Sequence, residues 1–284
     1  MKKAGSDVSS LYTTMCILVI ATVVSQRVAR AQEHGQEPHA IEDNSFFIEE
    51  AYNQEQGVVQ HINTAMYQTT PRKSIAYSFT QEWPLWGEDH QLSYTVPYQF
   101  VEGGMYSGLG DVLINYRYQL SGKECWATVA PRLSLSLPSG NAEQGRGSGG
   151  AGIQLSLPAS KVLTETLVAH FNLGVTVTPR ARGFSDAGTG VVHTLSSYSA
   201  GTSLIWLTAP HFNLMLECLA TSTAGFDGRG DVARTLQTVI SPGFRFAIEV
   251  GNLEVVPGFA LPLFIAEGTV DTGAFLYLSF EHPF

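Results

Sequence analysis

The chain is poor in charged side chains. Asp, Glu, Lys and Arg make up only 14% of its 284 residues, whereas about 25% is usual for a soluble domain. Beyond residue 60 the sequence also lacks the 3.6-residue spacing of apolar side chains that an amphipathic helix requires. These absences argue against an ordinary soluble surface and against a helical core. The 28 glycines and the 11% of aromatic residues instead favour many strands joined by turns.

Recognisable cofactor and metal motifs are absent as well. No group of Cys, His and carboxylate residues has the spacing of metal ligands. The glycine-rich stretch at 139–150 lacks the Lys-Ser/Thr ending of a phosphate-binding loop. No metal, cofactor or nucleotide is therefore expected. Cys125 and Cys218 fall far apart in the predicted strand order, so we expect both to be free thiols.

Residues 1–31 have the organisation of a cleaved signal peptide. Lys2 and Lys3 precede an apolar run at 15–24, and Ala29-Arg30-Ala31 is an A-x-A cleavage site. The run is shorter than the roughly 20 apolar residues that a membrane-spanning helix needs. We therefore expect export, with the mature chain starting at Gln32.

Residues 32–56 form a separate acidic segment without Lys or Arg. It carries seven acidic residues: Glu33, Glu37, Glu42, Asp43, Glu49, Glu50 and Glu55. Removing residues 1–31 takes away a net charge of +3, which changes the total from −9 to −12 and argues against a nucleic-acid partner. The stretch "DNSFFIEEAYNQ" predicts a short helix capped by Asp43, Asn44 or Ser45, with Phe46, Phe47 and Tyr52 as apolar contacts.

Two interpretations of this acidic segment stay open. Its carboxylates could dock on Arg117, Arg132 or Arg245 and plug the periplasmic mouth of a barrel. Alternatively, the segment could be a disordered periplasmic leader.

From residue 57 to residue 284 the sequence alternates between apolar and polar residues. In "HQLSYTVPYQF", for example, Leu92, Tyr94 and Val96 fall on one face, and Ser93 and Thr95 on the other. Twelve such segments are predicted, at 57–67, 73–82, 90–101, 109–120, 125–137, 149–158, 164–177, 194–206, 210–221, 235–248, 252–265 and 272–284. Ten or fourteen strands are the alternatives to this count.

The connections between these segments are short and long in turn, so the long ones fall on one side of an up-and-down sheet. A tilted strand of about ten residues also crosses an apolar layer of about 25 Å. Alternation alone would fit a soluble sandwich equally well. Together with export and low charge, however, it predicts an all-β fold: a transmembrane up-and-down antiparallel β-barrel of about 12 strands. Its periplasmic turns would be short and its extracellular loops longer.

The final stretch "TGAFLYLSFEHPF" resembles the C-terminal signal strand of bacterial outer-membrane proteins. The matching positions are Leu276, Leu278, Phe280 and Phe284, while His282 departs from the usual aromatic residue. The resemblance implies recognition by the barrel assembly machinery and a location among outer-membrane lipids of a Gram-negative bacterium.

Three stretches, "SGLGDVLINYRYQL", "APRLSLSLPSG" and "FNLGVTVTP", resemble the outer-membrane family named for the MetA pathway of phenol degradation. The resemblance covers roughly residues 57–284. It implies a transporter or channel for passive or facilitated uptake of small solutes, often hydrophobic or aromatic. The alternative is a structural or surface-interaction barrel without transport.

An outer-membrane hydrolase is a further alternative, but no spacing singles out a nucleophile and base. The available residues would be His170, His193, Ser196, Ser197, Asp186 and Asp231. We therefore predict no catalytic residue and no enzyme.

Function should lie on the inward, polar face of the barrel. The candidate lumen-lining residues are Asp111, Asn115, Arg117, Arg132, His170, Asn172, Gln237, Arg245, Glu254 and Glu281. A purely structural interpretation, in which these residues pair with one another and fill the barrel, stays open. Asp111 and Arg132 are expected to form an ion pair if "SGKE" is the turn between their strands.

Overall fold

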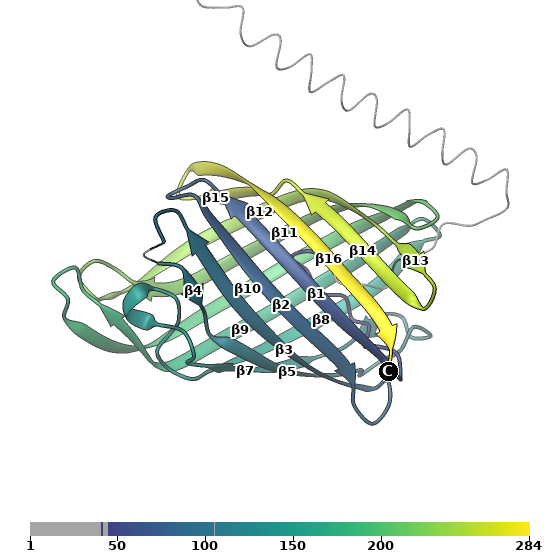
Figure 1. Cartoon of the computed structure of the whole chain (residues 1–284), viewed down its shortest axis with the longest axis horizontal. Helices are drawn as coiled ribbons and strands as arrows, with labels where there is room; N and C mark the ends of the chain where they lie inside the picture. Colours follow the sequence, from purple (N-terminus) through teal and green to yellow (C-terminus); the bar gives the residue numbers. More distant parts are fainter. Residues whose placement is uncertain (1–40, 42–44, 105) are drawn as a thin grey trace, which may run out of the picture.

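The structure is a computed structural model, and it describes residue 41, residues 45–104 and residues 106–284 (Figure 1). The predicted signal peptide at 1–31, about half of the acidic segment and the helix-capping candidates Asp43 and Asn44 lie outside the described residues. Within the described part of the chain, no helix is long and apolar enough to cross a membrane.

Apart from one short 3-10 helix, the regular elements of the described chain are antiparallel β-strands. Its elements are β1 (Val58–Gln68), β2 (Ser74–Pro84), β3 (His90–Val101), β4 (Gly108–Leu109), β5 (Val112–Tyr118), β6 (Thr128–Val129), β7 (Arg132–Leu137), η1 (Ala142–Gln144), β8 (Gly152–Thr164), β9 (Leu167–Phe184), β10 (Gly190–Ala209), β11 (Phe212–Phe226), β12 (Val232–Phe246), β13 (Ile248–Val250), β14 (Leu253–Ala260), β15 (Leu263–Ala266) and β16 (Thr269–Pro283). Short breaks separate β4 from β5, β6 from β7, β12 from β13 and β14 from β15. The barrel therefore has twelve strands, and the predicted fold is confirmed.

The first and last strands close the sheet. β1 pairs with β16 over its whole length, from Val58 opposite Pro283 to Gln68 opposite Gly273. Figure 1 shows yellow β16 beside blue β1. The N–H of Phe284 also donates to the carbonyl of Gly57 at 2.9 Å. Closure pairs the strand edges that would be unsatisfied in hydrocarbon.

The two faces of the sheet are inverted relative to those of a soluble protein. Large apolar side chains point outward and are exposed, as in Leu173 (60% exposed) and Leu276 (57%). Polar side chains point inward and are buried, as in Ser134, Glu217 and Arg245, each at most 1% exposed. This inversion distinguishes a membrane barrel from the sandwich that alternation alone would allow.

The connections differ in detail from the sequence-based prediction. Residues 178–193 and 222–234 were expected to be loops, but β9–β10 and β11–β12 continue through most of them and turn at 185–189 and 227–231. Backbone pairing between antiparallel neighbours extends these two hairpins past the shorter strands. The long connection at 138–151 contains η1, whose first turn is capped by the Asn141 side chain.

The opposite end of the barrel holds the two chain ends of the barrel sheet and mostly short turns, such as those at 165–166 and 210–211. One connection at this end, residues 119–131, is longer than the predicted "SGKE" turn because β6 forms within it. The two described cysteines, Cys125 in this connection and Cys218 in β11, are free and exposed, as predicted.

Candidate functional site

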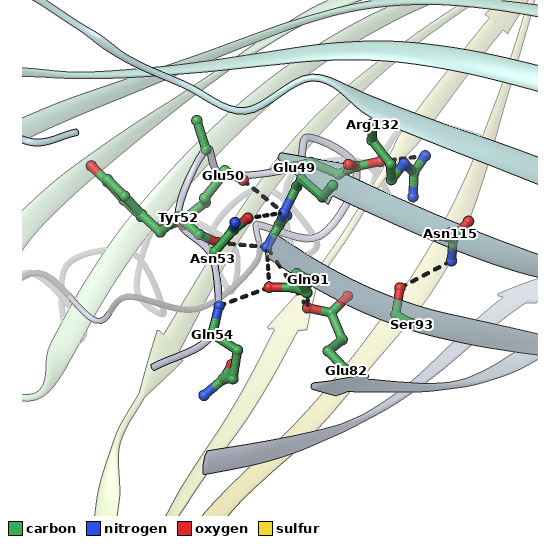
Figure 2. A network of polar contacts seen from close by, with 12 residues as sticks. Glu49, Glu50, Tyr52, Asn53, Gln54, Glu82, Gln91, Ser93, Asn115 and Arg132 are labelled. Carbon is green, nitrogen blue, oxygen red and sulfur yellow. Dashed lines mark hydrogen bonds and ion pairs between the residues drawn. The ribbon is translucent and has the colours of Figure 1, made fainter. Parts of the chain in front are cut away.

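Residues 45–56, here called the tail, lie inside the barrel and contact inward side chains from strands all around it. The predicted helix is wrong for the described residues, because 45–56 form bends and irregular backbone (Figure 2). The backbone N–H groups of this segment are bound by barrel side chains instead of by carbonyls one helical turn away. Three arginines and a set of hydrogen-bond acceptors hold it in place.

Two arginines bind the two neighbouring tail carboxylates. Arg132 at the start of β7 lies 2.7 Å from Glu49, and Arg245 near the end of β12 lies 2.9 Å from Glu50. The Arg245 and Glu50 side chains are 1% and 4% exposed. Arg245 also donates to the carbonyl of Ile41 at 2.6 Å. Because both charges of the buried pair are desolvated, loss of either partner would leave an uncompensated charge.

The third arginine, Arg117 in β5, binds the tail mainly through its backbone. Its guanidinium donates to the carbonyls of Glu50 and Tyr52 and, at 2.9 Å, to the side chain of Asn53. Gln91 in β3 orients the guanidinium at 3.0 Å, beside Glu82. Figure 2 shows the tail residues Glu50, Tyr52 and Asn53 gathered around this network. Arg117 thereby fixes the course of the chain between residues 50 and 53.

Inward side chains of the barrel, here called the wall, accept hydrogen bonds from the backbone N–H groups of the tail. Glu217 in β11 accepts from Phe47 at 2.9 Å and from Ile48 at 3.1 Å. Ser160 in β8 accepts from Ala51, Gln119 from Asn53 and Gln91 from Gln54, at 2.7 to 3.1 Å. Sequence reasoning missed these acceptors. The signal that could have found one of them is Glu217 itself, a carboxylate within an otherwise apolar strand segment.

Glycines in the wall make room for the apolar side chains of the tail. A Cβ atom on Gly258 in β14 would lie 2.5 Å from Cζ of Phe46, and a Cβ on Gly201 in β10 would lie 2.3 Å from Cδ1 of Ile48. Phe46 also packs on the rings of Phe275 and Tyr277 in β16, with ring centroids 5.3 Å apart. The wall therefore fits the apolar side chains of the tail in shape and binds its carboxylates through opposite charges.

A cavity of about 210 Å³ lies between the tail and one side of the wall. The cavity is lined by polar residues, among them Arg132 and Asn115, and by apolar ones, among them Phe46, Phe47 and Tyr277. The interior at this level therefore offers both a charged and an aromatic surface.

The sequence-predicted lumen residues occupy different parts of the interior. Arg117, Arg132 and Arg245 bind the tail, as described above. His170 lies under the tail, with its ring hydrogen-bonded to Ser160 at 2.7 Å. The side-chain amide of Asn172 faces the backbone of Glu49. Gln237, Glu254 and Glu281 have inward positions on β12, β14 and β16, in step with the buried residues Val239, Val256 and Ser279.

Asp111 does not pair with Arg132, so the predicted ion pair is wrong. The register of β5 and β7 places Arg117 opposite Arg132 and Val112 opposite Leu137, at the other end of the strands. Asp111 instead accepts hydrogen bonds from the backbone of Gly140 and Ser148. It orders the connection at 138–151.

Among the residues weighed as a hydrolase set, Ser196 and His193 have other partners. Ser196 accepts a hydrogen bond from Arg234 at 2.9 Å, and the ring of His193 lies 6.1 Å from that of Phe226. Within the part of the chain that the structure describes, no group of three or more His, Cys, Asp or Glu residues could hold a metal ion.

The four positions of the C-terminal signal lie on the outside of the closing strand or just after it. Leu276, Leu278 and Phe284 are exposed, and Phe280 stacks on His61 of β1 at 4.7 Å. Recognition of this strand by an assembly machinery stays a prediction.

Comparisons with known proteins show similarity at the level of the fold. No protein-family model and no curated protein matches the chain. Among solved structures, an outer membrane channel from Pseudomonas putida F1 is 13% identical with a TM-score of 0.57, over 82% of this chain and 98% of that one. The NanC porin is 7% identical with a TM-score of 0.49, over 80% of this chain and 100% of that one. At 13% identity the likeness to the Pseudomonas putida F1 channel concerns the fold alone, which is that of an outer-membrane β-barrel.

Proposed function

We propose that the protein is a channel of the Gram-negative outer membrane whose periplasmic end is closed by its own tail. It passes small solutes, among them hydrophobic or aromatic ones, by passive or facilitated diffusion. The resemblance to the family of the MetA pathway of phenol degradation supports this solute class. The proposal includes export by a signal peptide cleaved before Gln32 and insertion by the barrel assembly machinery.

The observation that carries the proposal is the docking of the tail. A filled structural barrel needs only side chains that pair with one another across the interior. Here Arg132 and Arg245 form salt bridges with Glu49 and Glu50, two residues of a segment that precedes the barrel strands. That segment can leave without breaking a single strand pair, so the barrel can open while its fold persists.

The test is planar-bilayer conductance of the refolded chain starting at Gln32, compared with a chain that lacks residues 32–56. Both proteins are first checked for heat-modifiable migration, which reports a folded barrel. We expect low conductance from the longer chain and a stable, larger conductance from the shorter one. Uptake of an aromatic acid and of a neutral aromatic into liposomes then measures selectivity. Two folded proteins that pass neither ions nor aromatics would refute the channel and favour a structural or surface-interaction barrel.

A further inference from the structure

The cavity beside the tail contains hydrogen-bonding groups without partners. Asn115 in β5 is 2% exposed, and its Oδ1 has no partner within the described residues. The Nε of Arg132 in β7 is likewise buried and has no acceptor there. Both residues line the cavity. Buried polar groups are normally satisfied, so each such atom requires an explanation.

These two atoms require opposite hydrogen-bonding groups on any molecule that binds in the cavity. The Nε of Arg132 is a donor and needs an acceptor, whereas the Oδ1 of Asn115 is an acceptor and needs a donor. Asn115 lies opposite Ser134, two residues along β7 from Arg132. Diagonal neighbours of this kind have backbones about 7 to 8 Å apart, so their side chains can reach the same occupant. That occupant must accept a hydrogen bond from Arg132 and donate one to Asn115.

The salt bridge between Glu49 and Arg132 leaves part of each group unused. Oε1 of Glu49 contacts the guanidinium at 2.7 Å, while Oε2 is buried without a donor among the described residues. A carboxylate free of the chain could approach Nε and Nη2 side by side and use both oxygens. Glu49 therefore binds Arg132 through one carboxylate oxygen only, and the Nε of Arg132 stays without an acceptor among the described residues.

The apolar residues of the same lining favour an occupant that also has an apolar part. They include Phe46, Phe47, Ile62 and Tyr277. Aromatic side chains attract rings in offset or tilted arrangements. The volume of about 210 Å³ admits one ring-sized molecule.

We propose that this cavity is a binding site for a small aromatic carboxylate that also carries a hydroxyl group. The carboxylate takes the place of Glu49 on Arg132, the hydroxyl donates to Asn115, and the ring lies against Phe47 and Tyr277. The tail residue Glu49 is thus an internal competitor of the solute. The inference rests on the proposed function for its biological use, because it names the solute class of that channel.

The test is equilibrium binding of 4-hydroxybenzoate to the refolded chain in detergent, measured by calorimetry. Benzoate lacks the hydroxyl, and 4-hydroxybenzyl alcohol lacks the carboxylate. We expect 4-hydroxybenzoate to bind more tightly than either. Arg132→Gln should weaken its binding at least tenfold, and Glu49→Gln should strengthen it about tenfold because the competitor is removed. Asn115→Ala should lower the affinity for 4-hydroxybenzoate to that for benzoate and leave benzoate unchanged.

Arg234→Gln is the matched control. It removes an equal charge from an arginine that binds Ser196 and Ser222 and lies over the ring of Tyr198, away from the cavity, and it should leave binding unchanged. Equal binding of the alcohol and the acid, or no response to Glu49→Gln, would overturn the proposal even if Arg132→Gln fails to fold. Because calorimetry does not depend on conductance, a chain that binds but never conducts would refute only the channel. A truncated chain that conducts beside a full chain that binds nothing would refute only the site.

Discussion

Replacing Gly258 by valine should release the tail while leaving its ion pairs chemically intact. The new Cβ would lie 2.5 Å from Cζ and 2.7 Å from Cε1 of Phe46, so the ring must move. The next atom is the carbonyl oxygen of Phe244 at 3.3 Å, a contact that a small adjustment relieves. Gly243 is a poorer choice because a Cβ there would also lie 2.9 Å from the backbone of Phe259.

The expected magnitude follows from the contacts that the ring gives up. Phe46 packs against Phe275 and Tyr277, and burial of a phenylalanine contributes about 1.5–3 kcal/mol. Because the ring is only half-buried, we take about half of this value, roughly 1 kcal/mol, for its loss. Since about 1.4 kcal/mol corresponds to a tenfold change, the undocked population should rise by roughly fivefold.

The assay is cleavage by a glutamyl endopeptidase at Glu49 and Glu50, which the docked tail buries or half-buries. When undocking is fast relative to cleavage, the rate follows the undocked population. Gly225→Val in β11 is the control, since a Cβ there has no atom within 4 Å. A Gly258→Val chain that is cleaved no faster than this control would refute the idea that the glycine accommodates the tail.

Other properties of the barrel can be tested independently of the tail. Leu276→Arg, in the middle of β16 on the outward face, should destabilise the barrel by about 2–4 kcal/mol in denaturant titrations in lipid; no change would contradict a lipid-facing position. In vesicles a charged thiol reagent should label Cys125 in its connection, whereas Cys218, exposed within β11, should react only with an apolar reagent. Hydrogen bonds, chiefly from the N–H of Asp231, hold the pKa of the Asp227 carboxyl below its ordinary 3.8. The folded turn therefore favours the ionised form of Asp227. The hydrogen bonds to this carboxylate stabilise the turn at neutral pH, and this stabilisation is lost as the pH falls through the lowered pKa. The amide resonance of Asp231 should accordingly shift during acid titration with a midpoint below 3.8; a midpoint at or above 3.8 would contradict this.

The sequence predicted the barrel well because alternation is a property of every strand. Leu92, Tyr94 and Val96 repeat at a period of two, and so do the residues of most other segments. Hairpin lengths were harder to predict. β9 ends only at Phe184, and β10 already begins at Gly190, because their backbones keep pairing beyond the ends of the other strands. Such pairing requires no distinctive side chains.

Part of the interior site could also be anticipated from charge alone. A tail with acidic residues and no basic ones, together with inward arginines, already suggested contacts with Arg132 and Arg245. The course of the backbone could not be anticipated. A short helix was expected within 43–54, but Glu217 and Ser160 bind N–H groups that a helix would use internally. Whether a wall carboxylate can reach those groups depends on the shape of the closed barrel.

The tail's docking site also sets an order of events during folding. Its parts come from strands far apart in the chain: Gln91 from β3, Arg132 from β7, Glu217 from β11 and Tyr277 from β16. No partial sheet contains all of them, so the tail, which precedes every strand in the chain, can complete its contacts only after the last strand has paired. A barrel that lacks any of these strands therefore lacks part of the set of contacts that holds the tail inside.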